Sequence, residues 1–243
     1  MTDLEIAVQD ATGAGAALSG GATRVELCTA LRMGGLTPSQ GSVEAVLDRV
    51  QGHPNFVHAL VRSRGGGYVY SDEEISTMAR EIRHLKNAGV HGVVVGALTA
   101  EGAIDLAALE QWVAAADGLP VTFHRAIDAT ADPLVQLARL AGTGVGRVLT
   151  SGGAVNSIDG SSVLGAMVKQ GPAGIEIMAG GGVRIPDIPA LVGLGVDAVH
   201  LSARVPHLDP YPAGPGGGAQ ELDWTSSELV AQARAAVSQL AHS

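Results

Sequence analysis

The most informative segment for the fold is Ile175-Glu176-Ile177-Met178-Ala179-Gly180-Gly181-Gly182-Val183-Arg184. Its first part, Ile175–Met178, alternates branched apolar residues with other side chains, which is typical of a β-strand whose two faces differ. The three glycines that follow predict a loop whose backbone approaches an anion and donates N–H groups to it. The stretch therefore predicts a strand that ends in a ligand-binding loop.

Similar short runs alternate with helical patterns from one end of the chain to the other, which predicts repeated βα units and a parallel sheet. The predicted strands are Leu4–Val8, Arg24–Leu27, Asn55–Val61, Gly92–Val95, Pro120–Phe123, Arg147–Leu149, Ile175–Met178 and Ala198–Leu201. Helix starts between them include the capping box at Ser71–Glu74 and the pair Asp132-Pro133.

The chain has 243 residues, and a barrel of eight βα units typically needs about 250. We therefore expect one domain over residues 1–243, an α/β fold in the form of a single (β/α)8 TIM barrel. A doubly wound sheet is the rival architecture, but it would show a glycine-rich turn directly after the first strand, and Val8-Gln9-Asp10 shows none.

The C-terminal part departs from the regular spacing. Residues 206–224 are rich in proline and glycine and are expected to form a long loop after the last strand, close to the barrel mouth. The last helix is expected over residues 226–240.

Composition excludes several classes of function. A formal net charge of −9 with no basic run argues against nucleic acid as a partner. No uninterrupted apolar stretch approaches the roughly 20 residues that cross a bilayer, so a membrane is not expected either. The single cysteine, Cys28, cannot form an internal disulfide, and the N-terminus lacks a signal-peptide pattern. We expect a cytoplasmic protein.

The two faces of the predicted strands differ in chemistry. Residues predicted to pack under the helices are apolar: Val25, Leu27, Val121, Phe123, Ile175, Ile177, Val199 and Leu201. Residues predicted to face the barrel axis are largely polar: Glu5, Glu26, Cys28, His58, Arg62, Thr122, His124, Glu176, Met178, His200 and Ser202. Because a barrel used only as a scaffold would fill this space with branched aliphatic residues, the polar interior predicts a site at the C-terminal ends of the strands.

Three inward residues are candidate acid–base groups, namely Glu26, His124 and Glu176. His124 is favoured over His58 because charged residues follow it, whereas His58 is expected to be a hydrogen-bonded core residue. The alternative is structural, with the glutamates paired to arginines in a buried ion network that fixes strand register.

The loops after the strands supply candidate groups for an anion. Gly180–Gly182 and Ser202 occupy the two loops where barrels often bind phosphate, and Arg62 and Arg64 carry guanidinium groups suited to carboxylate or phosphate. The predicted ligand-binding residues are Arg62, Arg64, Arg125, Asp128, Ser151, Gly180, Gly181, Gly182, His200 and Ser202. They predict an enzyme that acts on a small anionic or phosphorylated metabolite.

Six motifs between Leu4 and Ala203 carry a family resemblance. They are Val25-Glu26-Leu27-Cys28, Gly34-Gly35-Leu36-Thr37-Pro38-Ser39, Arg62-Ser63-Arg64-Gly65-Gly66, Thr122-Phe123-His124-Arg125-Ala126, Leu149-Thr150-Ser151-Gly152 and Met178-Ala179-Gly180-Gly181-Gly182-Val183. On these motifs the sequence resembles the CutC copper homeostasis proteins. The resemblance implies a (β/α)8 barrel, a homodimer or higher homo-oligomer, and copper binding in copper homeostasis.

The copper ligands that the resemblance suggests are Cys28 and His124, since copper(I) prefers sulfur and also binds imidazole. Two positions depart from the family pattern, because Ala7 stands where a cysteine is common and Ser63 where a proline is common. Four functions stay open at this point. They are copper binding, an enzyme for an anionic metabolite, an oligomeric scaffold whose carboxylates and arginines saturate one another, and a metal enzyme that holds a harder ion. Ligands for such an ion would be Glu26, Glu176, His124 and His200, although no H-E-x-x-H spacing supports it.

Overall fold

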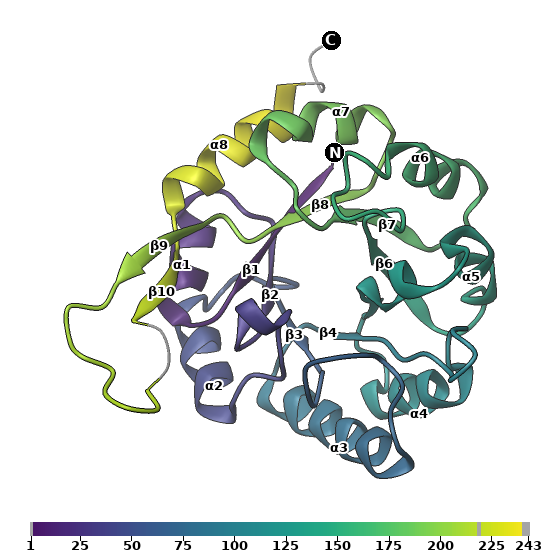
Figure 1. Cartoon of the computed structure of the whole chain (residues 1–243), viewed down its shortest axis with the longest axis horizontal. Coiled ribbons are helices and arrows are strands. Elements are labelled where there is room, and N and C mark those ends of the chain that lie inside the picture. The colour runs from purple at the N-terminus through teal and green to yellow at the C-terminus, as the bar shows by residue number, and fades with distance from the viewer. Residues whose placement is uncertain (1, 218–219, 240–243) are drawn as a thin grey trace.

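The computed structural model describes residues 2–217 and 220–239 and has eight parallel strands closed into a barrel (Figure 1). Each strand pairs with the next one in the sequence, and β1 pairs with β8 to close the ring. Helices surround the strands on the outside. The predicted (β/α)8 TIM barrel is confirmed.

The barrel strands are β1 (Asp3–Val8), β2 (Arg24–Leu27), β3 (Val57–Leu60), β4 (Gly92–Val95), β5 (Val121–Phe123), β6 (Val145–Thr150), β7 (Glu176–Gly180) and β8 (Ala198–Leu201). All eight overlap the predicted ranges. The third strand begins later than predicted because Asn55 has a φ of +59°, in the left-handed region that a strand cannot contain.

The helices are α1 (Ala11–Ser19), α2 (Gln40–Arg49), α3 (Asp72–Ala88), α4 (Leu106–Ala116), α5 (Pro133–Arg139), α6 (Ser161–Gln170), α7 (Ile188–Gly193) and α8 (Ser227–Ser238), with short 3-10 helices η1 (Leu31–Met33), η2 (Arg125–Ala129) and η3 (Ile185–Asp187). Both predicted helix starts are confirmed. Ser71 and Glu74 form a reciprocal capping box, and the Asp132 carboxylate accepts from two backbone amides beside Pro133. Within the described ranges, no helix has the length and apolar character needed to cross a bilayer.

Strand alternation divides the side chains as the sequence predicts. The outward residues of the strands pack into one large apolar core under the helices, which includes Val25, Leu27 and Phe123. Inside the barrel, Glu5, Glu26, His58, Thr122 and His124 are all buried. The predicted polar interior is therefore confirmed. The contacts of these side chains determine whether they are structural or belong to a site.

The predicted loop over residues 206–224 is wrong at both ends. Strands β9 (Arg204–Leu208) and β10 (Glu221–Thr225) pair antiparallel and form a hairpin that projects beside α1 (Figure 1). Pro206 lies within β9, which is compatible with a strand because the hairpin has free edges. The last helix is confirmed over Ser227–Ser238, with Ser226 as its N-cap, and residue 240 of the predicted range lies outside the described residues.

Asp223 holds the hairpin to the barrel. Its carboxylate, only 9% exposed, accepts hydrogen bonds from Arg32 in η1 and from Arg204 at the start of β9. Glu221 forms a second ion pair with Arg32. These ion pairs tie the hairpin to the loop that follows β2.

Candidate functional site

A cavity of about 650 Å³, which we call the top pocket, opens where the carboxyl ends of the barrel strands meet. Its volume lies in the range of roughly 300–1,000 Å³ that is usual for small-molecule sites. The predicted site residues that line it are Glu26, His124, Arg125, Asp128, Gly181, Gly182, His200 and Ser202. These eight predicted site residues therefore meet in one pocket.

A chain of carboxyl and imidazole groups lies at one wall of the top pocket, which Glu26 and His200 line with the buried Glu5 behind them. The Nδ1 atom of His200 lies 2.8 Å from Oε1 of Glu5, and its Nε2 atom lies 3.6 Å from Oε2 of Glu26. The three residues come from adjacent strands, since β1 pairs with both β2 and β8. Glu5 also forms a buried ion pair with Arg24. Glu5 was predicted to face the barrel axis but not to belong to the site. Its position beside His200 follows from the pairing of β1 with β8, which closes the barrel.

Burial and neighbouring charges set the protonation of this wall. Burial raises the pKa of Glu26 to about 7, with Glu5 adding to the rise and His200 opposing it. Burial alone would lower the pKa of His200, but the hydrogen bond to Glu5 and the charges of both glutamates raise it. Burial alone would raise the pKa of Glu5, but Arg24 and His200 hold it well below its usual range. The wall thus shifts His200 toward its cationic form, beside a carboxyl group that exchanges its proton near neutral pH.

His124 contributes a neutral imidazole. Its Nδ1 atom accepts a hydrogen bond from the Ala126 amide at 3.1 Å, so the ring proton resides on Nε2. Nε2 is buried and has no hydrogen-bond partner within the part of the chain that the structure describes. Burial, followed by the positive charge of Arg62, lowers the pKa of His124 to about 3. The side chain can therefore donate one hydrogen bond from Nε2, and no described residue accepts it.

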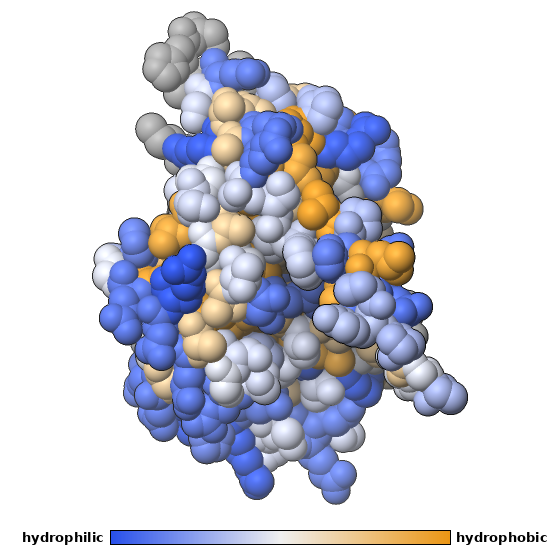
Figure 2. All heavy atoms as spheres, turned by 90° about the vertical axis from the view of Figure 1, so that its left-hand side faces the viewer, coloured by the Kyte–Doolittle hydropathy of each residue, from blue (hydrophilic) through white to orange (hydrophobic). Residues whose placement is uncertain are grey.

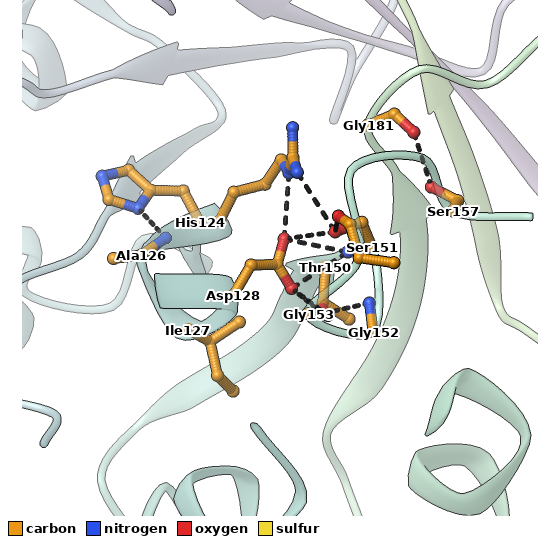
Figure 3. Close-up of polar contacts among 12 residues, drawn as sticks. His124, Ala126, Ile127, Asp128, Thr150, Ser151, Gly152, Gly153, Ser157 and Gly181 are labelled. Carbon is orange, nitrogen blue, oxygen red and sulfur yellow. Dashed lines mark hydrogen bonds and ion pairs between the residues drawn. The ribbon is translucent and has the colours of Figure 1, made fainter. Parts of the chain in front are cut away.

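The loop Gly181–Val183, which we call the glycine loop, lines the pocket beside this wall. None of its three amides donates a hydrogen bond to another described residue. Gly181 and Gly182 have φ values of +116° and +58°, which favour glycine. The amide and hydroxyl of Ser157 both donate to the Gly181 carbonyl and hold the loop in place (Figure 3). Free amides on a fixed loop make an anion-binding arrangement.

Arg125 lies against the glycine loop. A Cβ atom at Gly181 would stand 2.6 Å from the guanidinium carbon of Arg125, so a larger residue would push this flexible side chain away from the loop. Asp128 accepts from Arg125 at 2.9 Å, from the Thr150 hydroxyl at 2.5 Å and from the Ser151 amide (Figure 3). Asp128 is thus saturated, and its role is to orient Arg125 and the loop after β6.

Several predicted ligand-binding residues have structural partners instead. Arg62 is buried and donates to the backbone carbonyls of Met33, Gly35 and Gly66, which ties together the loops after β2 and β3. Arg64 pairs with Glu74 at the start of α3. Neither arginine lines the top pocket.

Ser151 and Gly180 also lie behind the pocket surface. Ser151 is fully buried and hydrogen bonds to Arg125, Asp128 and the Ala154 carbonyl. A Cβ atom at Gly180 would come within 2.3 Å of Leu149, so this glycine allows close packing inside the barrel.

Glu176 is at the wrong end of the barrel for an acid–base role in the top pocket. It is the first residue of β7, whereas the pocket lies at the carboxyl ends of the strands. Its side chain is 47% exposed and pairs with Arg147 on β6 at 2.5 Å. Glu176 therefore has the structural role that the sequence left open, an ion pair between neighbouring strands.

The chain is a (β/α)8 barrel whose top pocket combines buried carboxyl and imidazole groups with a glycine-rich loop. Residues 2–205 match the CutC family model, and the chain belongs to the CutC family. A CutC protein of Porphyromonas gingivalis is 40% identical over 240 residues, covering 95% of this chain and 96% of the relative. One of Xanthomonas campestris is 40% identical over 238 residues, covering 94% and 97%.

Solved structures agree with this assignment. A CutC structure from Streptococcus agalactiae, whose name refers to copper homeostasis, has a TM-score of 0.75 and 31% identity, covering 82% of this chain and 98% of that one. A thiamine phosphate pyrophosphorylase from Pyrococcus furiosus has a TM-score of 0.63 at 13% identity, covering 98% and 96%, which shows the fold alone.

The predicted copper ligands do not fit a copper ion. Cys28 lies in an apolar cluster with Leu60 and Val94 and does not line the pocket. Burial, with the negative charge of Glu26 added, raises its pKa well above the usual value, which disfavours the thiolate that copper(I) binds. A metal-bound histidine usually donates its second ring N–H, whereas Nδ1 of His124 accepts. Among the described residues, no group of three or more His, Cys, Asp or Glu side chains could hold a metal ion.

Proposed function

We propose that this protein is an enzyme that binds a small anionic metabolite in the top pocket and transfers a proton within it. One observation carries the proposal: the same cavity contains the free amides of the glycine loop and a buried carboxyl group, Glu26, with a pKa of about 7. A carboxyl group that titrates near the working pH suits general acid–base catalysis. His200 adds an imidazole donor that its neighbouring glutamates shift toward the cationic form, and the neutral His124 lines the same pocket.

The charges around the pocket favour an anion over a metal cation. Arg125 and Arg204 line the cavity, and His200 favours its cationic form. These groups attract a phosphate or carboxylate and repel copper. Copper binding, which the name of the Streptococcus agalactiae relative suggests, would depend on the buried thiol of Cys28.

Calorimetric titration with inorganic phosphate tests the anion site. We expect the wild type to bind phosphate and Arg125→Gln to bind it at least about tenfold more weakly, because a hydrogen bond to a charged group contributes roughly 1.5–3 kcal/mol. Arg64→Gln is the matched control, since Arg64 lies outside the pocket and should leave the affinity unchanged. Equal affinity in all three proteins would contradict the proposal.

Titration with copper(I) against a competing chelator tests the alternative. Wild type and Cys28→Ser should compete equally weakly, because the Cys28 thiol is buried and protonated. Stoichiometric copper binding that Cys28→Ser abolishes, together with no phosphate binding, would replace the enzyme proposal with the copper one.

Homo-oligomer formation and a cytoplasmic location are also proposed for this protein. The projecting hairpin supports the first, because it exposes apolar side chains that a second copy of the chain would cover. The single free thiol of Cys28 supports the second, since a reducing compartment keeps thiols free.

A further inference from the structure

Glu26 and His200 face the same cavity and form an ion pair without a hydrogen bond between them. Their nearest atoms, Oε2 and Nε2, are 3.6 Å apart, longer than a hydrogen bond. Glu26 makes no hydrogen bond to any other described residue, whereas His200 is held through Nδ1 by Glu5. Each therefore keeps one atom of the ion pair without a hydrogen bond, and the two atoms are close enough to engage neighbouring atoms of one ligand.

The remaining lining restricts the chemistry that this pair can perform. The chain has only two lysines, Lys86 in α3 and Lys169 in α6, and neither lines the top pocket, so an imine with a substrate carbonyl is excluded there. Cys28 does not line the pocket either, so no thiol nucleophile reaches it. Direct proton transfer between side chain and substrate is what these residues can supply.

The glycine loop fixes where the charged end of the ligand lies. The loop follows β7, and β7 pairs with β8, the strand that contains His200. The glycine loop therefore lies next to Glu26 and His200 in the barrel. Three free amides and the Arg125 guanidinium match the several acceptor oxygens of a phosphate monoester. Ala7, Leu60 and Leu149 line the same cavity with apolar surface and suit a short carbon chain.

We infer that the top pocket enolises a small phosphorylated carbonyl compound, with Glu26 as the base and His200 as the acid. This inference rests on the proposed function and specifies its substrate class and reaction. The Glu26 carboxylate takes the proton from the carbon next to the carbonyl, and the electron pair of the broken C–H bond forms the C=C bond of the enol. The carbonyl oxygen receives the displaced π electrons and accepts the Nε2 proton of His200. Return of the Glu26 proton to carbon and of the oxygen proton to His200 completes the cycle without any oxidant or reductant.

Exchange of carbon-bound hydrogen in D2O measures this step directly. The protein is incubated with dihydroxyacetone phosphate, ribulose 5-phosphate or fructose 6-phosphate, and loss of the proton signal next to the carbonyl is followed by NMR. We expect exchange well above the buffer rate for at least one of the three probes, and none above that rate for unphosphorylated dihydroxyacetone. Glu26→Gln should slow the exchange by about 100-fold or more, in line with the usual contribution of a general base.

The variants separate this inference from the proposed function. His200→Gln should slow exchange while phosphate binding persists, and Arg64→Gln should change neither. Phosphate binding without exchange of any of the three probes would overturn the enolisation and leave the anion site standing. Exchange that is equally fast in Glu26→Gln would also overturn it, whereas loss of phosphate binding in the wild type would remove the proposed function itself.

Discussion

Glu26 should reduce the stability of the protein as the pH rises. Its carboxyl group has an ordinary pKa of 4.5, which burial raises to about 7 in the folded chain. Between these values the unfolded chain loses the proton and the folded chain keeps it, so the free energy of unfolding falls with pH. Glu26→Gln removes this effect, and we expect the variant to be more stable than wild type by about 3 kcal/mol at pH 8, with the gain absent near pH 4.

Urea denaturation at pH 4, 6 and 8 measures this difference. Glu44→Gln is the control, because Glu44 is exposed on α2 and the substitution should change stability little at any of these pH values. A Glu26→Gln variant that is less stable than wild type at pH 8 would show that the ionised carboxylate stabilises the fold.

The sequence correctly predicted those site residues whose place depends only on the direction of the side chain from its strand. Glu26 and His200 lie at inward strand positions and His124 directly follows β5, and strand alternation predicts the direction of all three side chains. The sequence did not reveal how far along the barrel axis a residue sits, which misplaced Glu176. Nor did it reveal the backbone carbonyls that surround Arg62, since these come from loops whose paths depend on the folded chain.

The glycine loop after β7 is expected to be required for phosphate binding. Gly181→Ala should abolish phosphate binding, because Gly181 has a φ of +116° and an added Cβ atom would stand 2.6 Å from the guanidinium carbon of Arg125. Gly174→Ala, just before β7, is matched in strain, with a φ of +87°, but its Cβ atom would meet nothing within 4 Å. Both variants should lose about 1–3 kcal/mol of stability, and only Gly181→Ala should lose the anion.

Thermal melts and phosphate calorimetry on the two alanine variants separate strain from the loss of the site. Retention of wild-type phosphate affinity by Gly181→Ala would show that the ligand does not use this loop.

The hairpin is the element that sequence reasoning missed. Proline and glycine in residues 206–224 indicated a loop, yet Val205 and Trp224 pair across β9 and β10. The pairing depends on Asp223, which binds Arg32 from the other end of the sequence. A contact between residues 191 positions apart leaves no local pattern, so only the folded chain shows it.

For the whole molecule, the barrel was predictable because the same βα signal occurs eight times. An error at one strand boundary, such as that at Asn55, does not change the topology when seven other units support it. Assembly has no such repeated signal in the sequence.

The hairpin predicts how two copies of the chain associate. Among the described residues it is a two-stranded sheet, and such sheets are marginal in water unless something covers them. Leu208 and Leu222 are 70% and 44% exposed on it, and apolar side chains lie among hydrophilic ones on the face that carries it (Figure 2). A second copy would cover this surface with its own hairpin in a symmetric contact.

Light scattering after size-exclusion chromatography measures the association. We expect the wild type to have at least twice the chain mass of 24.5 kDa, and Leu222→Asp to shift toward the monomer, because a carboxylate in an apolar contact is costly to bury. Leu106→Asp is the control, since Leu106 is 37% exposed at the start of α4, away from the hairpin. A monomeric wild type, or equal behaviour of the two variants, would show that this hairpin does not join copies of the chain.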